Sequence, residues 1–162
     1  MATTVNIPID FRNPRVSSLA GNSWFSVLAL TNWDAGHWEF LKDVDGKIYG
    51  VVPVPKNVNA TPNAKIILQM AWNTTSGISR LSVKSVNVAN GATLNASFTA
   101  EASQDITVPG TAYFREDVTF TLTNAPAADD LLLVEVFHEG AHANDSVAVN
   151  TLLFEAFLQV DI

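Results

Sequence analysis

The stretch Asp130-Leu131-Leu132-Leu133-Val134-Glu135-Val136-Phe137, followed by His138-Glu139-Gly140-Ala141-His142, decides between two folds. Its last five residues match H-E-x-x-H, a zinc-protease signature in which two histidines share one face of a helix. The residues before them alternate as Val-Glu-Val-Phe, which is the period of a β-strand, and Ala143-Asn144-Asp145-Ser146 are turn formers. On a strand, the two histidines would lie about 13 Å apart, which is too far to bind one ion. The sequence therefore predicts a strand that stops near His138 and a turn after it.

Period-two alternation recurs along the chain, and no stretch keeps helical spacing over three turns. The expected strands are Thr3–Asp10, Ser23–Thr31, Gly36–Lys42, Lys47–Val54, Ala64–Asn73, Ile78–Ala89, Thr93–Ala100, Asp105–Val108, Tyr113–Leu122, Leu131–Phe137 and Leu152–Asp161. Short strands with turns every 8–12 residues are typical of a sandwich or barrel. We predict an all-β protein, an antiparallel β-sandwich of jelly-roll type. It forms a single domain over residues 1–162, with residues 1–22 as a candidate extended N-terminal arm.

Composition narrows the classes of function. The net charge is −7 and the sequence pI is about 4.7, which argues against a nucleic-acid partner. Charged residues make up 15% of the chain, below the usual share of about 25%, so we expect copies of the chain to cover part of the surface. The sequence has no cysteine, no signal-peptide pattern and no apolar stretch long enough to span a bilayer. We therefore expect cytoplasmic synthesis and no membrane partner.

The C-terminal two thirds, from Tyr49 to Ile162, carry a recognisable pattern. The strand Asp130–Val136 enters a loop containing Gly140, Ala143, Asn144, Asp145 and Ser146, and the apolar strand Leu152–Phe157 follows. Further upstream are Ala64–Trp72, Ser79–Val88 and the turn Asn90-Gly91. This pattern resembles a family of jelly-roll virion proteins of tailed bacteriophages. His142 stands where that family usually has an acidic residue.

The resemblance implies a non-enzymatic structural role as a capsid decoration (cement) or head-fibre protein on the capsid surface of a virion. It also implies a homo-oligomer, with a trimer as the favoured state, that contacts the major capsid protein or another virion protein. For the contact surface we predict the arm, through Ile7, Phe11, Arg12 and Arg15, because its prolines favour an extended path and its two arginines suit an acidic neighbour. The arm could instead be the first edge strand of the sandwich.

A second interpretation starts from the tryptophans. Trp33 and Trp38 flank Asp34-Ala35-Gly36-His37, which we expect to form a loop tip. Exposed aromatic rings on a β-sandwich can stack on sugar rings, so these two side chains predict a carbohydrate-binding or receptor-binding module. Alternatively, Trp24 and Trp72 lie in the core, and Trp33 and Trp38 lie at its rim or in a subunit contact.

The third interpretation is a zinc hydrolase that uses His138, His142 and Glu139. It requires the helix that the alternation before His138 argues against. The remaining carboxylates downstream do not supply an obvious third zinc ligand, because Glu155 sits in an apolar strand pattern. We therefore predict no catalytic residues, no metal ligands and no cofactor.

Overall fold

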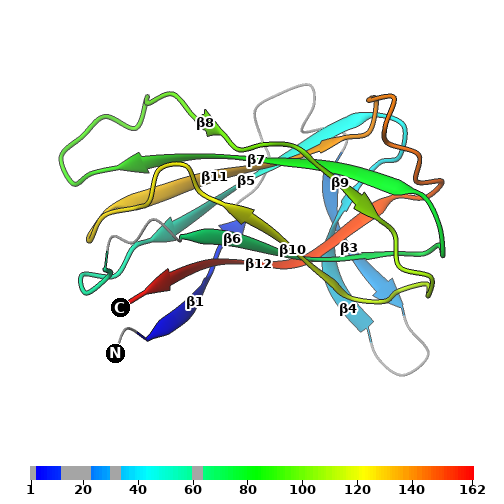
Figure 1. Ribbon diagram of the computed structural model, residues 1–162, viewed down its shortest axis with the longest axis horizontal. Coiled ribbons are helices and arrows are strands. Elements are labelled where there is room, and N and C mark those ends of the chain that lie inside the picture. The colour runs from blue at the N-terminus through cyan, green and yellow to red at the C-terminus, as the bar shows by residue number, and fades with distance from the viewer. Residues whose placement is uncertain (1–2, 12–22, 30–33, 60–63) are drawn as a thin grey trace.

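The computed structural model describes residues 3–11, 23–29, 34–59 and 64–162. In these residues there is no helix, and the strands form two antiparallel sheets packed face to face (Figure 1). The prediction of an antiparallel β-sandwich is confirmed. Within the same residues, no helix is long and apolar enough to cross a membrane.

The first sheet is built around the C-terminal strand. In spatial order it contains β10 (Glu116–Thr121), β6 (Lys65–Trp72), β12 (Thr151–Asp161), β4 (Asp34–Phe40) and β3 (Ser23–Ala29), and β1 (Thr4–Pro8) also pairs with β12. β6 lies along one edge of β12 from Thr151 to Gln159. The opposite edge of β12 is shared, because β4 pairs with its beginning and β1 with its end.

The second sheet contains, in order, β2 (Asp10–Phe11), β5 (Asp45–Pro53), β11 (Leu131–Glu139), β7 (Ile78–Val88) and β8 (Thr99–Ala100), and β9 (Gln104–Thr107) also pairs with β7. β11 is central, with unbroken register to β5 and to β7. The polar-apolar alternation of β7 breaks at Ser85-Val86 without a bulge, because these residues pair in register with Val134 and Leu133.

The core fills the space between the two sheets. Alternate residues of each strand face inward, as in β5, where Ile48 and Val52 are buried and Lys47 and Tyr49 face outward. Trp72 is 1% exposed, and its indole N–H donates to the hydroxyl of Thr151 at 3.1 Å. The expected core position of Trp72 is thus confirmed, whereas the side chain of Trp24 lies outside the described part.

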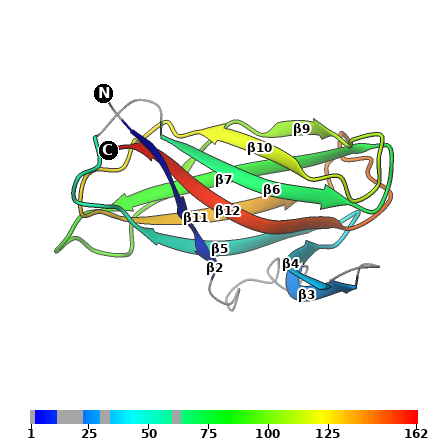
Figure 2. The same ribbon diagram turned by 90° about the horizontal axis from the view of Figure 1, so that it is seen from below.

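The described part of the predicted arm, residues 3–11, is extended and belongs to both sheets. β1 pairs with β12, and the backbone of Thr3 exchanges hydrogen bonds with that of Ile162, so the two ends of the chain lie together (Figure 1). The chain then crosses at Ile9, which is 6% exposed, and β2 pairs with β5. Figure 2 shows β1 beside β12, and the β3–β4 hairpin projecting at the edge of the sandwich.

Candidate binding site

A break in strand pairing along β12 forms the floor of a groove. β4 pairs with β12 only as far as Leu153, and β1 pairs with it only from Phe157 onward. Between these points the register of β12 with β6 shifts, so Phe154 is the extra residue of a β-bulge. The N–H of Ile9 donates to the carbonyl of Ala156 at 2.9 Å and marks one end of the break. Phe154 and Glu155 therefore lie between two strands, in a gap of the sheet edge.

The segment from Pro8 to Phe11 forms the first wall. It crosses from one sheet to the other and lies tightly against Gly50 of β5, the register partner of Phe11. A Cβ at Gly50 would lie 2.5 Å from Cγ2 of Ile9 and 2.8 Å from the ring of Phe11. Only glycine allows the two strands to approach this closely, and the approach holds the ring of Phe11 at the groove.

The β3–β4 hairpin forms the second wall. Phe25 and Trp38 are register partners, and their rings meet edge to face, with centroids 5.8 Å apart and an interplanar angle of 74°. The ring of Phe25 leans over Gly36, where a Cβ would lie 2.7 Å from its Cζ. Phe25 remains 60% exposed. A large aromatic side chain is therefore held in a defined place while most of its surface faces water.

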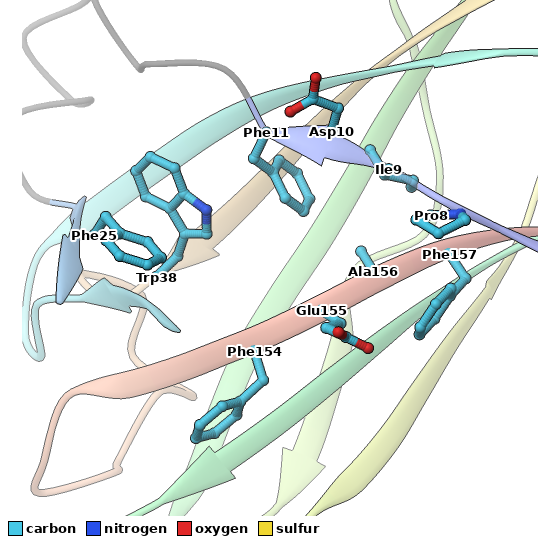
Figure 3. A pocket seen from close by; sticks show the side chains of 10 residues that line it. All are labelled: Pro8, Ile9, Asp10, Phe11, Phe25, Trp38, Phe154, Glu155, Ala156 and Phe157. Atoms are coloured by element: carbon cyan, nitrogen blue, oxygen red, sulfur yellow. The ribbon is translucent and has the colours of Figure 1, made fainter. Parts of the chain in front are cut away.

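Together these elements enclose an open groove of about 230 Å³ (Figure 3). Its lining residues are Pro8, Ile9, Asp10, Phe11, Phe25, Trp38, Phe154, Glu155, Ala156 and Phe157. Most of them are aromatic or aliphatic, and the two charged side chains, Asp10 and Glu155, are both exposed carboxylates. The groove can offer flat apolar faces and hydrogen-bond acceptors, which is the chemistry of a small-ligand site.

One residue that the sequence analysis singled out lines this groove. Trp38, one of the two proposed platform residues, lies in its wall, whereas Trp33 lies outside the described residues. The expected loop tip at residues 34–37 is wrong, because these residues begin β4 and pair with β3. The sequence missed Phe25, whose strand was predicted but whose partner was not. The signal that could have indicated the site is the pair of glycines, Gly36 and Gly50, inside strand patterns.

The predicted contact residues of the arm have different places. Ile7 pairs with Leu158 and packs on the core, and Phe11 lies in the groove wall. Arg12 and Arg15 lie outside the described residues. The two described residues are therefore engaged within their own sandwich, and an intersubunit contact through the arm stays a prediction.

The H-E-x-x-H string does not form a helix. His138 is a fully buried residue of β11, its Nε2 lies 3.0 Å from a carboxylate oxygen of Asp145, and its ring packs against Phe40. His142 follows the end of the strand and is exposed, and its Nδ1 accepts a hydrogen bond from the N–H of Asn144. Among the described residues, no group of three His, Asp or Glu side chains is placed to hold a metal ion. The zinc-protease arrangement is therefore not formed.

Glu139, the general base in that arrangement, belongs to an ion-pair network on the outer face of the second sheet. Its carboxylate accepts from Nε of Arg80 at 2.8 Å and from the Ser103 hydroxyl at 2.5 Å, and Arg80 also pairs with Asp105. Burial disfavours the ionised form of Glu139, but the hydrogen bonds from Ser103, Arg80 and Ser82 outweigh burial and lower its pKa. A carboxylate kept ionised by a fixed arginine is a structural group, poorly suited to accept protons.

Another carboxylate, that of Glu135, lies on the same outer face and is buried. It is 5% exposed and pairs with Lys84 at 2.9 Å and Lys47 at 3.4 Å. Burial favours its protonated form, but hydrogen bonds from Lys84 and Tyr49 and the charges of both lysines outweigh burial and lower the pKa of Glu135. These charges stabilise the sheet and do not reach the aromatic groove.

No protein-family model and no curated protein sequence matches this chain. Among solved structures, it is similar to the carbohydrate-binding module TmCBM61 in complex with β-1,4-galactotriose, with a TM-score of 0.45, 7% identity, and coverage of 97% of this chain and 86% of that chain. It is also similar to CsCBM6-3 from Clostridium stercorarium in complex with cellobiose, with a TM-score of 0.44, 11% identity, and coverage of 96% of this chain and 92% of that chain. A third similar structure is TmCBM27, a module that recognises mannan, with a TM-score of 0.44, 14% identity, and coverage of 98% of this chain and 99% of that chain.

These comparisons correct the leading interpretation of the sequence. The structures named above are carbohydrate-binding modules and not virion proteins, so the predicted capsid decoration or cement function is wrong. The physical reason is that the pattern behind it, a strand, a Gly-containing loop and an apolar strand, follows from the sandwich architecture and does not specify a function. The carbohydrate-binding alternative is the better supported one. Its support must come from the side chains of the groove, because at these TM-scores the similarities describe architecture.

Proposed function

We propose that this chain is a carbohydrate-binding β-sandwich module without a catalytic role, and that a sugar chain binds in the aromatic groove. The observation that carries the proposal is the position of Phe25. Its ring is 60% exposed, yet Gly36 and Trp38 fix where it lies. Burying a large apolar side chain is worth about 1.5–3 kcal/mol, so a ligand that covers this ring gains affinity at little conformational cost.

The chemistry of the lining suits a sugar. One face of a pyranose ring carries mainly C–H groups, which pack on an aromatic ring, while its hydroxyls project sideways as hydrogen-bond donors. The groove provides aromatic rings from Phe11, Phe25 and Trp38, with the carboxylates of Asp10 and Glu155 as acceptors. Its volume of about 230 Å³ suits a short section of a longer chain, with the rest of the polymer running past the open ends.

The test is binding to soluble polysaccharides, measured by affinity electrophoresis and then by calorimetry. Galactan, cellulose fragments and mannan are suitable first probes, since the compared modules were studied with such ligands. We expect Trp38→Ala and Phe25→Ala to weaken binding by about tenfold or more, which corresponds to about 1.4 kcal/mol.

A matched control is available on the same molecule. Phe114 is 54% exposed and lies outside the groove lining, so Phe114→Ala removes an exposed aromatic ring without touching the proposed site. Circular dichroism should show all three variants folded. If no polysaccharide binds, or if the Trp38 and Phe25 variants bind as well as the Phe114 variant, the groove is not a sugar site.

A further inference from the structure

Each sheet of the sandwich has strands with one edge that pairs with no other described strand. In the first sheet these are β10, β3 and β1, and in the second sheet they are β2, β8 and β9. A strand edge of this kind presents a row of backbone N–H and C=O groups that another strand can pair with. Proteins normally protect such edges with short strands, charged residues, proline or covering side chains.

Most of these edges are protected in one of those ways. β2 and β8 have two residues each, β9 has four, and β1 ends in Pro8. β10 begins with the charged pair Glu116-Asp117, and the side-chain amide of Gln104 donates to the backbone carbonyl of Thr119 at 2.8 Å. These five edges therefore offer little open backbone to a further strand.

β3 lacks this protection. Its sequence, Ser23-Trp24-Phe25-Ser26-Val27-Leu28-Ala29, contains no charged residue and no proline. All seven residues pair with β4 in unbroken register, so the backbone of β3 is regular along its whole length. Within the described part of the chain, β3 ends its sheet and lies on the outer side of the projecting hairpin (Figure 2). Segments of six or seven residues with high β-propensity, no charge and no proline readily pair with further strands. β3 is therefore the edge best suited to accept one.

We propose that β3 is an interface at which a second copy of this chain adds its own β3, antiparallel, so that two sheets become one. A second copy supplies a strand of the same length, also without charge and proline, and a twofold axis through the middle of β3 pairs the strand with itself. Like charges placed opposite each other on paired strands are destabilising, and β3 brings none to the contact, although each chain carries a net charge of −7. This pairing closes at two copies, and not at the three that the virion resemblance implied.

The interface leaves the aromatic groove open. Phe25 and Trp38 are register partners whose rings meet on one face of the sheet, whereas the added strand joins in the plane of the sheet. A twofold axis perpendicular to the sheet keeps the same face of both copies on the same side, so the two grooves open in the same direction. The mass of the assembly does not depend on whether the groove binds a sugar, so the interface and the proposed function are tested separately.

The first experiment measures mass by size-exclusion chromatography with light scattering at several concentrations. We expect the native chain to have twice the 17.5 kDa mass of one chain, and Ser26→Lys, which places a charge in the middle of β3, to have the mass of one chain. Thr119→Lys is the matched control, because it adds the same charge at an exposed residue of β10, at the opposite end of the same sheet, and should keep the native mass. The proposal is wrong if the native chain has the mass of one or three chains, if Ser26→Lys keeps the native mass, or if Thr119→Lys loses it.

Cysteine cross-linking decides the question if Ser26→Lys does not fold. The chain has no cysteine, so a disulfide in the Ser26→Cys protein can only join two copies. In an antiparallel pair centred on residue 26, which gives the longest overlap, the two Cα atoms lie about 4.5–5.5 Å apart, within the range of about 4.4–6.8 Å that disulfides span. With diamide as the oxidant, we expect Ser26→Cys to form cross-linked dimers and Thr119→Cys to stay largely uncross-linked. No cross-link at position 26, or equal cross-linking of the two variants, would show that the β3 edges of two copies do not meet.

Discussion

Replacing Gly36 by alanine tests the groove without removing any lining side chain. In the native structure the ring of Phe25 occupies the space above Gly36, and an added Cβ would lie 2.7 Å from its Cζ. Carbon atoms in contact normally lie about 3.5–4.0 Å apart, so the ring has to move by about 1 Å or more. It can do so because Phe25 is 60% exposed and the clash involves the far end of its side chain.

The expected effect on stability is small. Moving the ring disturbs its edge-to-face contact with Trp38, at 5.8 Å between centroids, and such a contact is worth about 0.5–1.5 kcal/mol. Replacing glycine by alanine within a strand returns about 0.5–1 kcal/mol through the lower entropy of the unfolded chain. These two terms nearly cancel, so the free energy of unfolding should change by less than about 1 kcal/mol.

The expected effect on binding is larger. The displaced ring no longer forms one surface with Trp38, so a sugar that covers both rings loses part of its contact. We expect Gly36→Ala to weaken binding by about five- to tenfold, or about 1.0–1.4 kcal/mol, measured by calorimetry with the polysaccharide that binds the native chain.

Gly50→Ala provides the contrasting variant. There the added Cβ would lie 2.5 Å from Cγ2 of Ile9, a residue that is only 6% exposed and cannot move into solvent. Overpacking of this kind costs about 1–3 kcal/mol, so Gly50→Ala should lower the midpoint of urea unfolding while Gly36→Ala should not. Native affinity in a folded Gly36→Ala protein would show that the ligand does not contact Phe25, and the reasoning about the groove wall would be refuted.

Three further predictions concern the rest of the sandwich. Asp145→Ala removes the carboxylate beside His138, whose side chain is 1% exposed, and should lower the free energy of unfolding by about 1–3 kcal/mol in urea titrations. The same change at the exposed Asp117 should alter the free energy of unfolding by no more than about 0.5 kcal/mol. Because the folded pKa of Glu135 is lowered, its stabilisation is complete above the ordinary glutamate value near 4.5 and is lost as the pH falls through the folded value. Lys84→Met should shift that loss of stability to higher pH. Urea titrations at a series of acidic pH values measure the shift, and a pH profile identical to that of the native chain would contradict the prediction. The homo-oligomer expected from the 15% share of charged residues stays a prediction, which light scattering at several concentrations tests, with a monomeric mass throughout as the contrary result.

Many of the strands were predictable because apolar residues that face the core alternate with polar residues that face outward, as in β5 and β10. In β11, Val134 and Val136 face the core, and His138 takes the next inward-facing position and is buried. The strand ends one residue later, at Glu139. Turn residues then end it, so a motif that usually indicates a helix could be assigned correctly to a strand and a turn. Local periodicity was sufficient here because β11 is central and both of its neighbours pair in unbroken register.

The groove could not be predicted in the same way, because it arises where strand pairing stops. The bulge at Phe154 lies in the run Leu152-Leu153-Phe154-Glu155-Ala156-Phe157, which is apolar at almost every position and so carries no alternation that could break. The crossing at Ile9 depends on a partner strand, β5, that lies far away in the sequence. Pairing between distant strands decides both features, and a single sequence does not state which strands pair.

The two glycines connect these observations to function. Within a strand, glycine weakens the sheet, because it packs no side chain and loses more backbone entropy on folding. Gly36 lies under Phe25, and Gly50 lies against Ile9 and Phe11. At both positions the strand is less stable than it would be with a larger residue, and at both an aromatic ring of the groove occupies the space that a side chain would fill. If the aromatic rings only covered the edge of the sandwich, larger residues could stand at positions 36 and 50 and the rings could lie elsewhere. At Gly36 and Gly50 the sheet is thus weakened where aromatic faces are presented, as expected if the rings are there to meet a ligand.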